Sequence, residues 1–85
     1  MSGQHHYLNI LPEYFQAIER GEKTFEVRLN DRNFQTGDVL QLQERSYGEY
    51  TGRVIECEVT YILDNPNFCK EGYVIMAIKV ISIEN

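Results

Sequence analysis

The sequence predicts a small, mainly β protein of the α+β class, a mixed barrel of about five strands with one main helix that caps an opening. Three observations support this prediction. The 85-residue chain is long enough for one domain, spanning residues 1–85, with one compact core. Five of its segments show the alternation or the apolar runs of β-strands, whereas only one shows a helical stripe. Closing a few strands into a barrel removes exposed sheet edges, which favours a barrel over a flat sheet.

The first two elements are predicted from residues 7–20. The segment "YLNIL" (residues 7–11) is a short apolar run, expected as a strand. The next segment, "PEYFQAIERG", continues the i, i+4, i+7 spacing of one helix face: Leu11, Phe15 and Ile18. Pro12 suits the first helical position, and Gly21 suits the residue after the helix, where the backbone turns left-handed. We expect one helix from about residue 12 to residue 20.

Two strands are expected in the middle of the chain. In "TFEVRL" one face carries Phe25, Val27 and Leu29, and the other carries Thr24, Glu26 and Arg28. The simplest reading makes the charged side the wet face of a half-buried strand. A loop then ends in the Gly37-Asp38 turn, after which "VLQLQ" (residues 39–43) directs Leu40 and Leu42 inward.

The C-terminal half is read as two loops that alternate with two strands. The loops are "RSYGEYTGR" (residues 45–53) and "DNPNFCKEG" (residues 64–72), which are rich in turn-forming residues. The strand "VIECEVTYIL" (residues 54–63) places every second residue on one face: Ile55, Cys57, Val59, Tyr61 and Leu63. The last segment, "YVIMAIKVISI" (residues 73–83), is apolar on nearly both faces, which predicts a central strand buried between layers.

Composition excludes several classes of protein. The net charge of −5 argues against bulk binding to duplex DNA, which needs a basic surface. Cys57 and Cys69 are too few for a disulfide framework, and we expect both thiols to be reduced. The chain shows no signal peptide and no run that could span a membrane, so we expect a cytoplasmic protein that does not bind membranes. No P-loop or dinucleotide fingerprint is present.

Opposite charges gather around the second predicted strand, in "RGEKTFEVRLNDR". One interpretation is a solvated strand whose Glu26 and Arg28 pair weakly with neighbours. The other is a binding site in which Lys23 joins Glu26 and Arg28 beneath the end of the helix. Arginine is a planar fork suited to phosphate or a base edge, and lysine is a point charge suited to phosphate or a carbonyl oxygen. A carboxylate between them would hold both in place or accept from a base amino group.

The segment "GEKTFEVR" fits Gly-x-Lys-x-x-Glu-x-Arg and resembles the signature of the ASCH (activating signal cointegrator homology) domain of the PUA-like superfamily. Together with "LPEYFQAIERGEKTFEVRLNDRNFQTGDVL", "YTGR" and "EGYVIMAI", it is similar to a small bacterial and phage-type branch. The resemblance implies a PUA-like barrel with a cleft between helix and barrel, lined by Lys23, Glu26 and Arg28. Gly21 would let the chain turn into that cleft. It also implies a role in binding nucleic acid or nucleotides.

One relative in that family hydrolyses an acetylated cytidine with a Lys, a Thr and a Glu. The position three residues after the Lys, where that pattern has Thr, is Glu26 in this chain. Thr24 lies only one position after Lys23, and no later Glu can be matched. The resemblance therefore carries Lys23 over, but not the complete catalytic set.

Several other residues are weighed as ligand contacts. Tyr47, Tyr50 and Arg53 would form a stacking and phosphate platform for single-stranded bases, or a hairpin packed on the barrel end. Asn30 and Arg32 would extend the cleft, or belong to an Asx-type turn in "NDRN". Less support is found for a metal site at His5-His6, for acid/base work by Glu56 and Glu58, or for a nucleophilic Cys69.

The sequence therefore predicts a module that binds RNA or a nucleotide above Lys23, Glu26 and Arg28. We expect no metal and no cofactor. A small amidohydrolase or nuclease acting on modified nucleosides or RNA is the alternative, with Lys23 and Glu26 as its candidate catalytic residues. A third class is a protein-interaction module whose acidic surface binds a basic partner.

Overall fold

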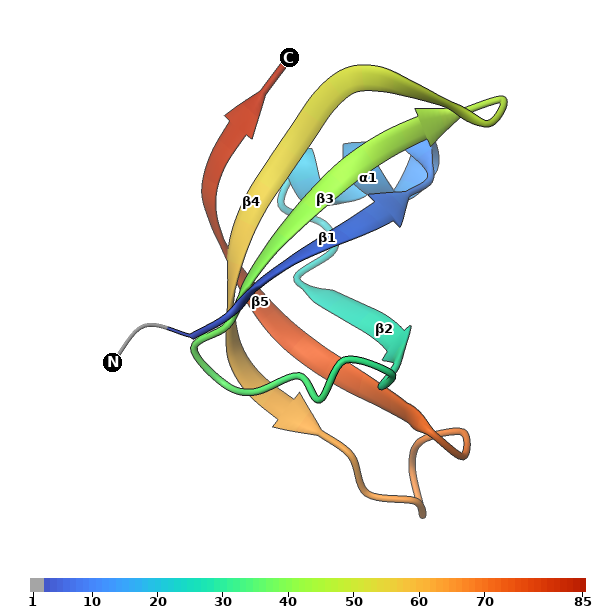
Figure 1. The fold of residues 1–85 in the computed structure, drawn as a ribbon, viewed down its shortest axis with the longest axis vertical. Helices are drawn as coiled ribbons and strands as arrows, with labels where there is room; N and C mark the ends of the chain where they lie inside the picture. Colours follow the sequence, from blue (N-terminus) through green and yellow to red (C-terminus); the bar gives the residue numbers. More distant parts are fainter. Residues whose placement is uncertain (1–2) are drawn as a thin grey trace.

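The computed structural model describes residues 3–85 and shows a single curled sheet with one short helix (Figure 1). The domain predicted over residues 1–85 thus includes Met1 and Ser2, which lie outside the described residues. Within residues 3–85 no helix is long and apolar enough to cross a membrane. The elements are β1 (His5–Ile10), α1 (Pro12–Glu19), β2 (Phe25–Leu29), β3 (Val39–Ser46), β4 (Glu49–Leu63) and β5 (Tyr73–Glu84).

The five strands form one mixed sheet in the order β1-β3-β4-β5-β2. β1 pairs with β3 in parallel, and the other three pairings are antiparallel. The sheet curls into a half-barrel whose two edge strands, β1 and β2, do not pair with each other (Figure 1). The predicted class, a small five-stranded barrel with one main helix, is confirmed, although the barrel stays open on one side.

Helix α1 begins and ends where the sequence predicts. Pro12 occupies its first turn, and Gly21 just beyond it has a φ of 78°, the left-handed conformation that glycine adopts without strain. Phe15 and Ile18 are buried in the core, whereas Leu11 is 54% exposed. Leu11 was expected in the same stripe; it lies outside because it is the extended residue that precedes the helix.

The core lies on the inner side of the half-barrel, between the sheet and α1. The inward residues of β3, Leu40 and Leu42, are fully buried as predicted. The other buried apolar residues are Leu8, Ile10, Phe15, Ile18, Phe34, Ile55, Cys57, Val59, Val74, Met76 and Ile78.

The prediction of a loop at residues 45–53 is wrong, because the chain forms a tight hairpin there. β3 runs to Ser46 and β4 starts at Glu49, leaving only Tyr47 and Gly48 between the strands. Their φ angles are 53° and 80°, the two positive values of a type I′ turn. That turn normally carries Asn or Asp at its first position, so the Tyr-Gly pair gave no hairpin signal.

The expected polarity of β2 is inverted. Glu26 is only 3% exposed, whereas Phe25, Val27 and Leu29 are 43%, 49% and 49% exposed. Glu26 and Arg28, on the inner face of this edge strand, lie toward the open side of the half-barrel, so the apolar side chains of β2 are on its other, more exposed face.

Two further expectations for the long strands are wrong. Register shifts between Val59 and Tyr61 turn Tyr61 outward, where it is 63% exposed, and bring Ile62 against the core instead. β5 is flanked by strands on both sides, but its C-terminal part is not buried on both faces, since Val80 and Ile81 are exposed. No second layer covers that part among the described residues.

Candidate ligand-binding cleft

A cleft of about 710 Å³ opens on the unpaired side of the half-barrel. Its walls come from the end of β1, from α1, from the segment that leads into β2, and from β2 itself, including Val27. Apolar and aromatic side chains form most of them, among which are Ile10, Leu11, Tyr14, Ala17 and Phe25. The charged residues at its border are Glu22, Lys23, Glu26 and Arg28. The three residues of the Gly-x-Lys-x-x-Glu-x-Arg pattern thus meet at one cleft.

Glu26 is the centre of this charged group. Its Oε1 accepts a short hydrogen bond from Lys23 Nζ, and its Oε2 accepts from Arg28 Nε at 2.8 Å. Its side chain is almost completely buried, whereas those of Lys23 and Arg28 are 15% and 23% exposed. Both carboxylate oxygens of Glu26 are therefore occupied as acceptors, while the side chains of Lys23 and Arg28 border the cleft.

Both cations keep hydrogen-bond donors for a ligand. Lys23 Nζ also donates to the backbone oxygen of Phe25 at 2.6 Å, so one of its three protons is left. Arg28 uses Nε for Glu26 and Nη2 for the backbone oxygen of Asn9 at 2.7 Å. Nη1 of Arg28 has no partner within residues 3–85. The site thus presents donors fixed in position by a buried acceptor.

Two aromatic rings flank the lysine. Lys23 Nζ lies 5.7 Å from the ring centre of Tyr14 and 5.1 Å from that of Phe25. Both distances are within the range of cation–π attraction. Both rings are partly exposed, so their faces are accessible to a planar ligand.

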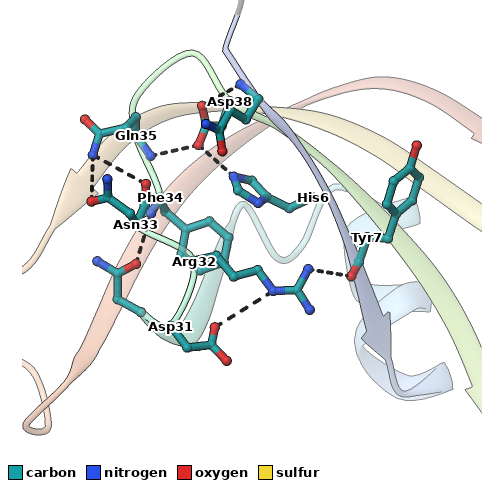
Figure 2. A network of polar contacts seen from close by, with 10 residues as sticks. His6, Tyr7, Asp31, Arg32, Asn33, Phe34, Gln35 and Asp38 are labelled. Atoms are coloured by element: carbon teal, nitrogen blue, oxygen red, sulfur yellow. Dashed lines mark hydrogen bonds and ion pairs between the residues drawn. The ribbon is translucent and has the colours of Figure 1, made fainter.

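A second arginine also reaches across the open side. Arg32 Nη1 donates to the backbone oxygen of Tyr7 at 2.9 Å, two residues before the carbonyl that Arg28 contacts (Figure 2). Arg32 and Arg28 both border a smaller hollow of about 170 Å³. Asn30 serves the turn, since its Oδ1 accepts from the backbone N–H of Phe34 at 3.0 Å. Arg32 therefore lies beside the cleft, whereas Asn30 fits the Asx-type turn.

The structure does not bring Tyr47, Tyr50 and Arg53 together as a platform. Tyr47 is fully exposed at the hairpin tip, and Tyr50 lies against Arg45 instead. Arg53 turns the other way and contacts Glu19 Oε1 at 2.9 Å, Glu44 Oε2 at 3.5 Å and the ring of Phe15 at 4.3 Å. It joins α1 to the sheet, which is a structural task.

A buried His–Asp pair was not predicted, because no local pattern indicates it. His6 lies in β1, where its Nε2 contacts Asp38 Oδ2 at 2.8 Å and its ring packs edge-on against Phe34 (Figure 2). Asp38 also accepts from the backbone N–H groups of Gln35 at 2.9 Å and Gln4 at 3.0 Å. Burial opposes its ionisation, but these hydrogen bonds together hold the pKa of Asp38 below its ordinary value. His6 therefore lies buried in β1, and Asp38 ties β1 to the loop before β3.

The cysteines and the paired glutamates take no part in the cleft wall. Cys57 is buried, and burial, assisted by the negative charge of Glu26, raises the pKa of its thiol to about 12. Cys69 is half-buried and free. Glu56 accepts from Gln41 at 3.2 Å, and Glu58 is exposed on β4. Within residues 3–85 no group of three His, Cys, Asp or Glu side chains is placed to hold a metal ion.

Comparison with known proteins gives a family and a fold. A family model described as a domain of unknown function (DUF3850) matches residues 5–78. An uncharacterised 12.9 kDa protein of Escherichia phage P2 is 34% identical over 76 residues, which are 89% of this chain and 69% of that protein. The crystal structure of hypothetical protein PH0355 has the same fold, with a TM-score of 0.62 and 18% identity over 92% of this chain and all of that one.

Proposed function

The chain belongs to the DUF3850 family, a domain of unknown function, and we propose on that premise that it binds single-stranded RNA or a nucleotide in the cleft between α1 and β2. The observation that carries the proposal is the group formed by Lys23, Glu26 and Arg28. The two oxygens of the buried Glu26 carboxylate hold Lys23 and Arg28 in position at the wall of a mainly apolar cleft. The similarity of this motif to the ASCH domain supports the same reading.

The size and chemistry of the cleft support a ligand of nucleotide size. Small-molecule sites are usually hollows of about 300–1,000 Å³ with apolar walls and a few fixed polar groups. The cleft has about 710 Å³, two aromatic rings and donors from Lys23 and Arg28. A base stacked near Tyr14 and Phe25 would offer its carbonyl oxygens to those donors.

The charge balance favours a base over a polyphosphate inside the cleft. Two cations and two carboxylates border it, because Glu22 adds a negative charge to that of Glu26. Such a neutral group has little attraction for several phosphates. We expect at most one phosphate to be engaged, by Arg28 or by the neighbouring Arg32. The affinity for RNA should therefore fall by no more than about 0.7 log units per tenfold rise in salt concentration.

The hydrolase alternative has less support from the geometry. Lys23 is engaged with Glu26 and a backbone oxygen, and the position where the hydrolase pattern has Thr is the buried Glu26. Thr24 is exposed and lies outside the cleft lining. Turnover of acylated cytidines or short RNAs that is lost in Lys23→Ala would reverse this ranking.

The experiment measures binding of a panel of nucleosides, nucleoside monophosphates and short single-stranded RNAs by titration calorimetry. We expect Lys23→Ala and Arg28→Lys each to lower the affinity about ten- to hundredfold, because a charge-assisted hydrogen bond contributes about 1.5–3 kcal/mol. The matched controls are Lys79→Ala and Arg20→Lys, which alter exposed cations outside the cleft. Circular dichroism checks that each variant is folded at the assay temperature. The proposal fails if the wild type binds nothing in the panel, or if the controls lose as much affinity as the cleft variants.

A further inference from the structure

The outer face of β2, β5 and β4 carries a continuous apolar surface. In the sheet register Val27 pairs with Ile75, which pairs with Leu63 on the other side. Ala77 lies between Phe25 and Tyr61 in the same way. We call the resulting surface the outer patch, made of Val27, Leu29, Tyr61, Leu63, Ile75 and Ala77.

No helix or second sheet among the described residues covers the outer patch. The only helix of residues 3–85 lies on the inner side of the sheet, where Phe15 and Ile18 join the core. Val27, Leu29 and Tyr61 are 49%, 49% and 63% exposed. Most sheets that expose one face to water carry polar residues there, so this apolar outer face is unusual. It marks an interaction surface.

We propose that the outer patch is the interface of a homodimer in which two copies pack sheet against sheet. This inference goes beyond the proposed ligand site, with which the outer patch shares Val27. Val27, Leu29 and Tyr61 are about half exposed and the other three residues are half-buried, so the patch exposes about 400 Å² per copy. Two copies facing each other bury about 800 Å², which is the size of a weak, transient interface.

The shape and charge of the patch fit a second copy. A two-fold interface must carry both projections and hollows on one surface. Here the small residue Ala77 is paired in the register with the bulky Phe25 on one side and the bulky Tyr61 on the other, so the surface alternates large and small side chains. The patch itself contains no charged residue, as is typical of interface cores. At its border, Glu58 pairs with Lys79 in the register, so the flank carries both signs and does not repel a copy of itself.

The test is analytical ultracentrifugation of the full chain from about 1 to 500 μM, a range that covers dissociation constants of micromolar order. We expect a monomer–dimer equilibrium that Leu29→Lys and Tyr61→Lys each weaken at least about tenfold, since each places a charge in the apolar contact. The two variants change different strands, so that a folding defect in one leaves the other informative.

The matched control is Tyr7→Lys, an equally exposed aromatic residue on β1, at the opposite edge of the sheet. It should leave the equilibrium unchanged. A wild-type chain that is monomeric throughout overturns the proposal, as does a dimer that Tyr7→Lys weakens as much as Leu29→Lys does. Because Tyr61 borders neither the ligand cleft nor the smaller hollow beside it, ligand affinity should persist in Tyr61→Lys, which separates this proposal from the proposed function.

Discussion

Replacing Glu26 by Gln tests the organisation of the cleft most directly. The glutamine keeps the size of the side chain, but its amide can accept a hydrogen bond only through its oxygen. One of the two bonds, from Lys23 or from Arg28 at 2.8 Å, is lost. The two cations also lose the one carboxylate within residues 3–85 that both of them contact. Because Glu26 is 3% exposed, solvent compensates little.

The expected cost follows from these contacts. A hydrogen bond between charged groups contributes about 1.5–3 kcal/mol, and unpairing a buried ion costs about 3–5 kcal/mol when no partner remains. Since Lys23 and Arg28 keep other contacts and partial exposure, we expect a loss of about 2–4 kcal/mol in the free energy of unfolding. For a domain of this size that lowers the Tm by about 10–25 °C.

The assay is urea and thermal unfolding followed by circular dichroism, with Glu58→Gln as the matched control. Glu58 is exposed on β4, so its replacement should change the free energy of unfolding by less than about 0.5 kcal/mol. A Glu26→Gln variant as stable as that control would show that the ion group does not organise this part of the molecule. Replacing Lys23, Glu26 and Arg28 together by Met should regain much of the stability while abolishing ligand binding.

Three further predictions concern sites away from the cleft. Asp38 has a folded-state pKa below its ordinary value of 3.8, so its ionisation contributes to the free energy of unfolding above about pH 4. This contribution is lost as the pH falls through the folded-state pKa. Urea unfolding between about pH 2 and 6 should show the loss, and Asp38→Asn should remove this pH dependence. In the native protein a thiol reagent at about pH 8 should modify the half-buried Cys69 and reach Cys57 only on unfolding; a reading of no free thiols would contradict the absence of a disulfide. Tyr47→Asn should raise the free energy of unfolding by about 0.5–1 kcal/mol, because Asn-Gly adopts the type I′ turn with less strain; an unchanged or lower Tm would refute this.

The elements that local chemistry defines could be predicted from the sequence. Pro12 and Gly21 bound the helix, and the alternation of Leu40 and Leu42 identifies a strand with one buried face. The motif residues Lys23, Glu26 and Arg28 were also expected to meet at a cleft beside the helix, and they do.

What could not be predicted depends on the tertiary arrangement. Alternation shows that Glu26 and Phe25 lie on opposite faces of a strand, but not which face is enclosed. That choice is set by the open side of the half-barrel, which faces Glu26. The His6–Asp38 pair joins residues 32 positions apart, and no local pattern reports such a contact. From the sequence, Arg53 is expected to be a surface residue. In the structure it contacts Glu19 of α1 and Glu44 of β3, which a local pattern cannot predict.

The two arginines that reach β1 have a consequence for the behaviour of the chain at high concentration. A bare strand edge recruits strands from other molecules, which leads to aggregation or to the exchange of segments between chains. On β1 the carbonyl oxygens of Tyr7 and Asn9 are already occupied by Arg32 and Arg28. An incoming strand would have to displace two guanidinium groups and leave their charges without these acceptors. The half-barrel can thus stay open to a small ligand while its edge remains closed to another polypeptide.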